Sequence, residues 1–393
     1  MGVTLAMMME LGADYPEIRD AVGRICAGFP GAYWRELEAA TAYPTAFVEA
    51  LTESGYLAAL IPESFGGAGL PLRAAAVILE TIHAAGCSAA ACHAQMYTMG
   101  TLLRHGSAKQ QERYLPPMAR GELRLQAFGV TEPGSGTDTP ALKTKAVRQG
   151  DRYVVNGQKI WTSRALHSDL MLLLVRTTPL DDCRKRSDGL SVLLVDLRDA
   201  IGNGLEIRPI ETMINHQTTE IFIDGLEVPA ANLLGDEGKG FRYILDGMNA
   251  ERILLSGEAV GDGRYFIERA VAYAKERQVF GGSIGQNQGI QFPLAKALAR
   301  LDAAELMARQ AAALFDAGSP CGREANSAKL LTAEAAWEAA EACFQTFGGF
   351  AFAREYDIER KWRECRLFQT APISTNMVLA YLAQTVLGLP RGY

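Results

Sequence analysis

The chain has 393 residues, of which 48% are hydrophobic and 21% charged, values typical of ordinary soluble globular proteins. This composition excludes a disordered or fibrous chain, and the length predicts two or three packed domains. The formal net charge of −6, without any long basic run, disfavours a nucleic-acid or anionic-membrane partner.

Targeting and metal signals are weak. Residues 1–9 have neither a basic flank nor a cleavage site, so we expect no signal peptide. The longest aliphatic run, 170–175, is far shorter than the roughly 20 residues of a membrane span, so no membrane partner is expected. The His residues lack metal-ligand spacing, which predicts no metal site. Seven scattered cysteines without a C-x-x-C pair favour a reducing cytoplasm, with most as small core residues: Cys26, Cys87, Cys92, Cys183, Cys321, Cys343 and Cys365.

The predicted elements form three groups along the chain. From Pro16 to about Leu115, apolar residues recur three and four apart, which predicts helices. From about Gln126 to Leu234, short β-rich runs alternate with turn residues. Long helical patterns then return from about Gly240 onward. The clearest runs are 152–157, 170–175, 191–196 and 219–225 for strands, 244–277, 288–316 and 321–346 for helices, and 177–189 for an exposed hairpin-type loop.

The first segment that suggests a ligand is 130–138, Val-Thr-Glu-Pro-Gly-Ser-Gly-Thr-Asp. Its two glycines and one proline force an irregular backbone, which gathers amide N–H groups and three hydroxyls near one point. Such a loop suits a polar or phosphorylated ligand. Taken alone, it is more typical of a plain polar turn, and Glu132 is expected to order that turn.

The second segment is 156–163, Asn-Gly-Gln-Lys-Ile-Trp-Thr-Ser. It predicts a tight Asn-Gly turn followed by a strand that ends at Trp161 and two hydroxyl residues. An aromatic face beside hydrogen-bond donors is what a flat heteroaromatic cofactor requires. The alternative is a core tryptophan followed by a helix cap.

Together these segments resemble the acyl-CoA dehydrogenase family of flavoproteins. Further family motifs follow in the same order, namely 277–281 (Arg-Gln-Val-Phe-Gly), Gln288, 345–349 (Gln-Thr-Phe-Gly-Gly) and Arg363, so the resemblance covers nearly the whole chain. It implies an α+β fold with an N-terminal α-helical domain, a central small β-barrel-like domain and a C-terminal four-helix bundle. The corresponding boundaries are 1–124, 125–236 and 237–393.

The resemblance implies FAD as the cofactor. In the family, the first two segments wrap the flavin, and Ser163 takes the place of the hydroxyl near flavin N5. The matching positions are Val130, Thr131, Thr137, Trp161 and Ser163. Positions that bind the FAD diphosphate and adenosine, partly from a neighbouring subunit, are matched by Arg277, Phe280, Gln288, Gln345 and Gly349. A site shared between subunits implies a homo-oligomer, usually a dimer of dimers, that is, a homotetramer.

The sequence departs from the family at the usual catalytic base. The segment 371–376 occupies the place of the family's Glu-Gly-Thr, with Pro372 at the glutamate position, and proline has no titratable group. Ser374 and Asn376 still match flavin-contacting positions. In a minority of members, including isovaleryl-CoA dehydrogenase, the base lies on a central helix, and there Glu251 is the candidate, on an apolar helix face. The alternative is a structural Glu251. Arg252 matches a position near the CoA pantetheine.

The implied reaction is FAD-dependent α,β-dehydrogenation of an acyl-CoA thioester to the trans-2-enoyl-CoA, with electrons passed to an electron-transfer flavoprotein. We therefore expect a cytoplasmic oxidoreductase of fatty-acid or branched-chain acyl metabolism. Two alternatives stay open: a flavin-dependent monooxygenase or oxidase on the same scaffold, and a non-catalytic scaffold that keeps FAD for stability. The sequence does not separate a CoA thioester from a carrier-protein thioester.

Overall fold

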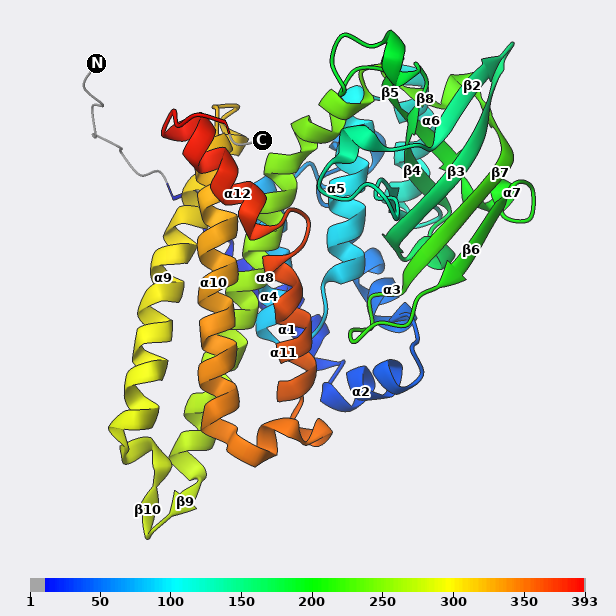
Figure 1. The fold of residues 1–393 in the computed structure, drawn as a ribbon. Helices are drawn as coiled ribbons and strands as arrows, with labels where there is room; N and C mark the ends of the chain where they lie inside the picture. Colours follow the sequence, from blue (N-terminus) through cyan, green and yellow to red (C-terminus); the bar gives the residue numbers. More distant parts are fainter. Residues whose placement is uncertain (1–10, 392–393) are drawn as a thin grey trace. The chain divides into compact units, whose positions relative to one another are not determined.

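The computed structural model describes residues 11–391, so the expectation about a signal peptide at residues 1–9 lies outside the described part of the chain. The chain divides into two compact units (Figure 1). We call them the bundle unit, Met1–Ala27, Pro71–Cys87 and Asn249–Tyr393, and the sheet unit, Gly28–Leu70 and Ser88–Met248. The three domain boundaries drawn from the sequence stay a prediction.

The sheet unit contains one mixed sheet and several helices. The order of the strands is β6-β7-β3-β2-β4-β5-β8, with β1 parallel to β4 beside this path. The strands are β1 (Leu125–Gly129), β2 (Lys145–Gln149), β3 (Arg152–Ser163), β4 (Leu170–Arg176), β5 (Leu190–Asp196), β6 (Leu205–Pro209), β7 (Thr218–Pro229) and β8 (Leu233–Leu234). The helices are α2 (Gly31–Ala39), α3 (Thr45–Glu53), α5 (Ala90–His105), α6 (Ala108–Ala119) and α7 (Leu197–Ala200).

Strands β4 and β5 contribute to two hydrophobic cores at once. Because side chains alternate across a sheet, Leu172 and Leu174 pack into a core that includes residues of α5 and α6. Met171 and Leu173 point to the opposite core, with residues of β3 and β7. A strand buried on both faces reads as a continuous apolar run, which is why 170–175 stands out in the sequence. The four predicted strands are confirmed within β3, β4, β5 and β7, and 177–189 joins the β4–β5 hairpin.

The predicted Asn-Gly turn is wrong. Asn156 and Gly157 lie inside β3, where the pairing with β7 shifts by one residue to form a bulge. A Cβ atom at Gly157 would lie 2.4–2.7 Å from atoms of Thr144, so this position needs glycine for close approach rather than for a turn. Pairing along the whole length of β3 therefore overrides the local turn preference.

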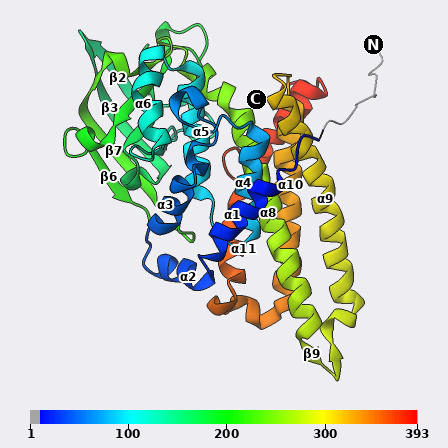
Figure 2. The same ribbon diagram turned by 180° about the vertical axis from the view of Figure 1, so that it is seen from behind.

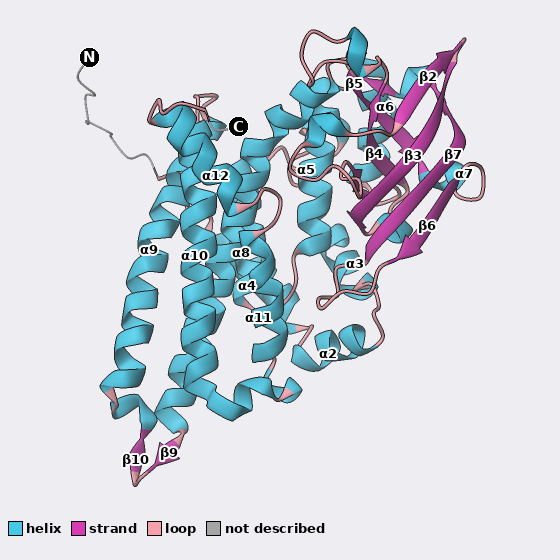
Figure 3. Cartoon of the chain, viewed as in Figure 1, coloured by secondary structure: helices cyan, strands magenta, loops and turns pink. Residues whose placement is uncertain are grey.

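The bundle unit is helical apart from a short hairpin at one end (Figure 3). Its helices are α1 (Pro16–Ala27), α4 (Leu72–Ala84), α8 (Gly240–Glu276, from Asn249 onward), α9 (Gln288–Asp316), α10 (Gly322–Phe347), α11 (Ile358–Arg366) and α12 (Thr375–Tyr381), and the hairpin strands are β9 (Gln278–Val279) and β10 (Gly282–Ser283). Between residues 11 and 391, no helix combines the length and apolarity needed to cross a membrane.

Glycines let α8 approach α4 closely. A Cβ atom at Gly257 would lie 2.6 Å from the carbonyl oxygen of Ala76, and one at Gly261 would lie 2.2 Å from that of Glu80. The two glycines are one helical turn apart and so share a face of α8. Figure 2 shows α1, α4 and α8 from behind. Elsewhere the core is rich in alanine, including Ala297 of α9 and Ala336 of α10, which allows the helices to pack tightly.

A network of buried charges joins α4, α8 and α11. The Lys361 Nζ atom lies 2.7 Å from Asp262 Oδ1 and 3.0 Å from Glu364 Oε2. The His83 Nδ1 atom lies 2.8 Å from the same Asp262 oxygen, and His83 Nε2 lies 3.6 Å from Glu258 Oε1. Lys361 and Asp262 are fully buried. Charges without access to water are tolerated because each has an opposite partner.

This network predicts a pH dependence of stability. Burial and Lys361 lower the pKa of His83, but Asp262 and Glu258 outweigh them and raise it from 6.5 to about 9. Because the folded-state pKa exceeds the unfolded value, the stabilisation is full below pH 6.5 and is lost as the pH rises through about 9. We expect the free energy of unfolding to fall across this window by up to about 3 kcal/mol relative to a His83→Gln variant. Urea unfolding followed by circular dichroism measures it, and identical pH profiles for the two proteins would refute the assignment.

Candidate functional site

The loop 130–138 follows β1 in the sheet unit and folds back on itself. The backbone N–H groups of Glu132 and Ser135 donate to each other's carbonyl oxygens at 3.1 and 3.0 Å. The Ser135 hydroxyl donates to the carbonyl of Asp138 at 2.8 Å and so is used within the loop. Thr137 is exposed, whereas Val130 and Thr131 are half-buried. The predicted irregular backbone of the loop is confirmed, and its first two residues, Val130 and Thr131, lie next to the end of β1.

Trp161 is held outward by a strained backbone. It has a φ of +62°, which is unusual for an aromatic residue, and its side chain is 57% exposed. The strain sits in a second bulge of β3, between the pairs Lys159–Ile221 and Thr162–Thr219 that fix the strand on either side. The alternative of a core tryptophan is therefore wrong. An exposed indole on a fixed backbone suits stacking against a flat ring.

The two segments predicted from the sequence lie side by side. The Ile160 N–H donates to the carbonyl of Thr131 at 2.9 Å, which joins the loop to β3 one residue before Trp161. Ser163 ends β3 opposite Thr218 and is half-buried. The structure thus brings Thr131 and Trp161 together in the sheet unit.

The Glu132 side chain accepts three hydrogen bonds that hold the same region. The Glu132 carboxylate accepts from the backbone N–H groups of Lys143 and Thr144 at 2.6 and 2.9 Å, as well as from Lys159. The expectation that Glu132 orders its own turn is therefore wrong for the side chain, which reaches a segment eleven and twelve residues further along. Its turn is closed by backbone hydrogen bonds instead.

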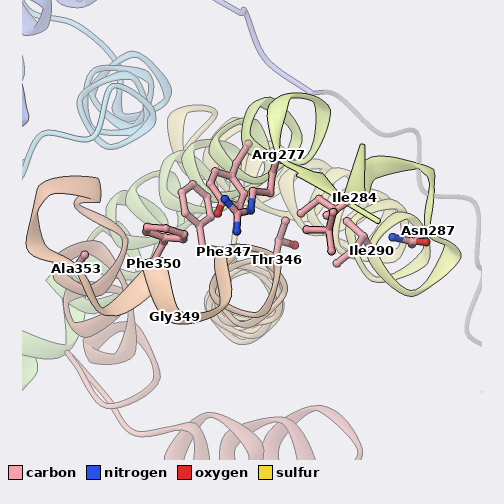
Figure 4. Close-up of a pocket in the computed structure, with 11 residues that line it drawn as sticks. Arg277, Ile284, Asn287, Ile290, Thr346, Phe347, Gly349, Phe350 and Ala353 are labelled. Carbon is pink, nitrogen blue, oxygen red and sulfur yellow. The ribbon is translucent and has the colours of Figure 1, made fainter. Parts of the chain in front are cut away.

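The bundle unit contains a cavity of about 680 Å³ near the β9–β10 hairpin (Figure 4). Arg277, which follows α8, has its guanidinium carbon 5.3 Å from the ring centre of Phe350. Gly349 lies beside that ring on the segment after α10, and Thr346 lies in the last turn of α10 (Figure 4). A cation, a hydroxyl and an aromatic ring around one cavity suit a nucleotide diphosphate. Its lining is Tyr273, Arg277, Val279, Ile284, Asn287, Ile290, Thr346, Phe347, Gly349, Phe350 and Ala353.

Three other predicted residues lie outside this lining. Phe280 stands at the tip of the hairpin with a φ of +54° and a fully exposed ring. Gln288 is the first residue of α9, and Gln345 lies in the last turn of α10; both are exposed. Figure 1 shows the hairpin and these two helix ends at the same end of the bundle. Tyr273 and Phe347, which form an aromatic wall of this cavity, do not belong to the motifs found in the sequence. Their rings are stacked, with the ring centres 4.1 Å apart.

The candidate base lies on α8. Glu251 is 8% exposed, and the neighbouring Leu254 and Leu255 are buried, which confirms the apolar helix face. Arg252 is half-buried and donates to Asn249 Oδ1 at 3.1 Å. Burial lowers the pKa of Arg252, and the negative charge of Glu251 acts in the opposite sense. The charges of Glu251 and Arg252 therefore interact.

The segment 371–376 is anchored to α10. Lys329, which is fully buried, donates from Nζ to the carbonyl of Ile373 at 2.8 Å. Ser374 precedes the first residue of α12, and Asn376 is exposed in its first turn. Pro372 carries no acid, so Glu251 keeps its position as the candidate base.

The residues present fit FAD. In the sheet unit, the exposed and backbone-fixed Trp161 beside Thr131 suits the flat flavin ring. In the bundle unit, Arg277 faces a cavity large enough for part of a nucleotide and supplies a fixed cation for a diphosphate. When bound, FAD supplies a hydride acceptor.

We expect an Arg277→Gln substitution to weaken FAD binding by about ten- to a hundredfold, because a charge-assisted contact to phosphate is lost. Titration of the apoprotein with FAD, followed by flavin fluorescence, measures the dissociation constant. Arg323→Gln, which removes an exposed cation from α10, should leave it unchanged. Equal affinities of the wild type and the Arg277 variant would remove this residue from the cofactor site.

Comparisons with known proteins agree with this chemistry. Models of the acyl-CoA dehydrogenase N-terminal, middle and C-terminal domains match residues 13–122, 127–226 and 238–387. Acyl-CoA dehydrogenase FadE12 of Mycobacterium tuberculosis is 34% identical over 342 residues, 86% of this chain and 87% of the relative. The Caffeyl-CoA reductase-Etf complex subunit CarC of Acetobacterium woodii is 30% identical over 336 residues, 85% of this chain and 87% of the relative.

Among solved structures, the glutaryl-coenzyme A dehydrogenase–glutaryl-CoA complex is similar with a TM-score of 0.89 at 26% identity, over 98% of both chains. The predicted α+β fold, with helical N-terminal and C-terminal domains around a β domain, is confirmed. FAD is the cofactor of this family. The chain belongs to the acyl-CoA dehydrogenase family of flavin-dependent oxidoreductases, which act on acyl-CoA.

Proposed function

We propose that this chain catalyses the α,β-dehydrogenation of an acyl-CoA thioester to the trans-2-enoyl-CoA, with FAD as the hydride acceptor. The observation that carries the proposal is the buried Glu251 carboxylate on the apolar face of α8, in a chain that has Pro372 at the position matched to the C-terminal base of many family members. A carboxylate away from water is suited to proton abstraction, because it is not stabilised by a hydration shell.

The roles follow from the chemistry of a thioester. Its carbonyl group acidifies the α-hydrogen, which Glu251 removes as a proton, while the β-hydrogen leaves as hydride. Arg252 is proposed to contact the pantetheine arm of the substrate. The residues proposed to hold FAD are Val130, Thr131, Thr137, Trp161, Ser163, Arg277, Phe280, Gln288, Gln345, Gly349, Ser374 and Asn376.

The proposed electron acceptor is an electron-transfer flavoprotein. The name of the CarC relative, a subunit of a Caffeyl-CoA reductase-Etf complex, supports it. Relatives that act on caffeyl-CoA and glutaryl-CoA also favour a CoA thioester over a carrier-protein thioester. A homotetramer is proposed as well, supported by the full exposure of the Phe280 ring at the end of the bundle. The cytoplasmic location stays a prediction.

A second candidate is an oxidase or monooxygenase on the same scaffold, and Pro372 is the observation that favours it. Steady-state turnover with an electron-transfer flavoprotein or with O2 separates the two. The dehydrogenase makes enoyl-CoA only when the flavoprotein, or a dye in its place, is present. Rapid turnover with O2 and no enoyl-CoA would favour the second candidate.

A further inference from the structure

A buried lysine holds the start of the loop 130–138 against β3. Lys159 is fully buried, and its Nζ atom donates to the carbonyl of Val130 at 3.0 Å and to Glu132 Oε1 at 2.9 Å. It lies on β3 next to Ile160, whose N–H donates to Thr131, and two residues before Trp161. One side chain and one backbone group therefore tie Val130, Thr131 and Glu132 to the strand that presents the indole.

Glu132 completes this link. It is 7% exposed, and its carboxylate accepts three hydrogen bonds, from Lys159 and from the backbone N–H groups of Lys143 and Thr144. Lys143 and Thr144 immediately precede β2, which pairs with β3. The ion pair thus connects the end of β1, the start of β2 and the bulged part of β3 at one point.

A gain in folding stability does not by itself explain the buried ion pair of Lys159 and Glu132. Removing two charges from water costs free energy, and well-packed apolar residues in the same place are often at least as stable. What a buried, fully bonded pair provides is a single geometry, because a shift of the loop would leave a charge without a partner. Here the geometry that it fixes is that of Thr131 relative to Trp161.

We propose that Lys159 and Glu132 are positioning residues for FAD: they act through the Val130–Thr131 backbone and not by touching the cofactor. This inference rests on the proposed cofactor site of the sheet unit. The reason is that the pair fixes the loop to β3 two residues before the strained, exposed Trp161. Without the pair, the backbone hydrogen bond from Ile160 to Thr131 would alone, in the described part of the chain, tie this part of the loop to β3, and the position of Thr131 relative to Trp161 would be less fixed.

The charge of Lys159 provides a second test of the proposal, the pH dependence of FAD binding. Burial lowers the pKa of Lys159 to about 8, with Glu132 acting in the opposite sense, and Glu132 is the charged group facing it within residues 11–391. The pKa of Glu132 is itself lowered: burial raises it, but Lys159 and the backbone N–H groups outweigh burial. FAD binding should therefore weaken as the pH rises through about 8 and Lys159 loses its proton.

The test compares FAD affinity with stability in four apoproteins: the wild type, Lys159→Met, Lys159→Met/Glu132→Gln, and the control Lys145→Met, an exposed lysine of β2. FAD dissociation constants come from flavin fluorescence, and unfolding midpoints come from urea titration without FAD. We expect Lys159→Met to raise the dissociation constant at least tenfold. The double variant should regain part of the lost stability, because no unpaired charge remains, but not the affinity, and the control should match the wild type.

A double variant that regains affinity together with stability would overturn the proposal, since the pair would then be merely structural. If the variants do not fold, the wild type still decides: a dissociation constant that stays flat between pH 7 and 9 contradicts a positioning role for charged Lys159. Neither readout uses turnover. A chain that binds FAD as expected but dehydrogenates no acyl-CoA would refute the proposed function and leave this inference standing.

Discussion

Replacing Glu251 with glutamine should slow the reduction of the bound flavin by an acyl-CoA about 10²- to 10⁴-fold. Glutamine has nearly the same shape as glutamate but cannot take up the α-proton. Because the carboxylate is buried on an apolar helix face, water is not expected to replace it as a base. Anaerobic stopped-flow measurement of the flavin absorbance gives the rate directly.

The matched control is Glu268→Gln, which changes an exposed carboxylate on the same helix and should leave the rate unchanged. FAD content and the unfolding midpoint of the Glu251 variant should equal those of the wild type, which separates a chemical role from a structural one. A Glu251→Gln protein that reduces its flavin at the normal rate would show that another group is the base.

The second large effect is expected at Lys361. A Lys361→Met substitution should lower the free energy of unfolding by about 2–4 kcal/mol, because, among the described residues, the buried Asp262 carboxylate then keeps only His83 as a cationic partner and the partly exposed Glu364 keeps only Arg360. Urea denaturation at neutral pH, followed by circular dichroism, measures the change. Lys296→Met is the control: this lysine is 60% exposed in its ion pair with Glu338, and its loss should cost less than about 1 kcal/mol.

A double variant, Lys361→Met/Asp262→Leu, tests the cause. If the loss of the ammonium partner of Asp262 is what destabilises the single variant, removing this carboxylate should restore part of the lost stability. A double variant less stable than the single variant by the full cost of Asp262→Leu alone would mean that the two charges are not coupled. Equal stabilities of Lys361→Met and the wild type would contradict the account of the network itself.

The sequence predicts helices and strands well where the spacing of apolar residues stays the same along the whole element. The long helices α9 and α10 and the apolar strands β4 and β5 lie close to the expected ranges. The short strands β1, β2 and β6 were not named, because each has five residues and is set by its neighbours. The turn at Asn156–Gly157 fails for the same reason, since local turn chemistry yields to pairing with β7.

For the site, residue identity was predictable and geometry was not. The motif pointed to Trp161 as an aromatic surface, but its positive φ and exposure arise from a bulge that no periodicity reveals. The partner of Lys159 is Glu132, 27 residues away, and only the pairing of three strands brings them together. The aromatic lining of the bundle cavity depends likewise on how Tyr273 of α8 meets Phe347 of α10.

The most direct test of the account is anaerobic mixing of the purified yellow protein with short, branched, medium and aromatic acyl-CoAs. We predict that at least one class bleaches the visible absorbance of the oxidised flavin and yields one trans-2-enoyl-CoA per flavin reduced. That class would define the acyl substrate. An FAD-loaded protein that no acyl-CoA bleaches would contradict acyl-CoA dehydrogenation by this chain.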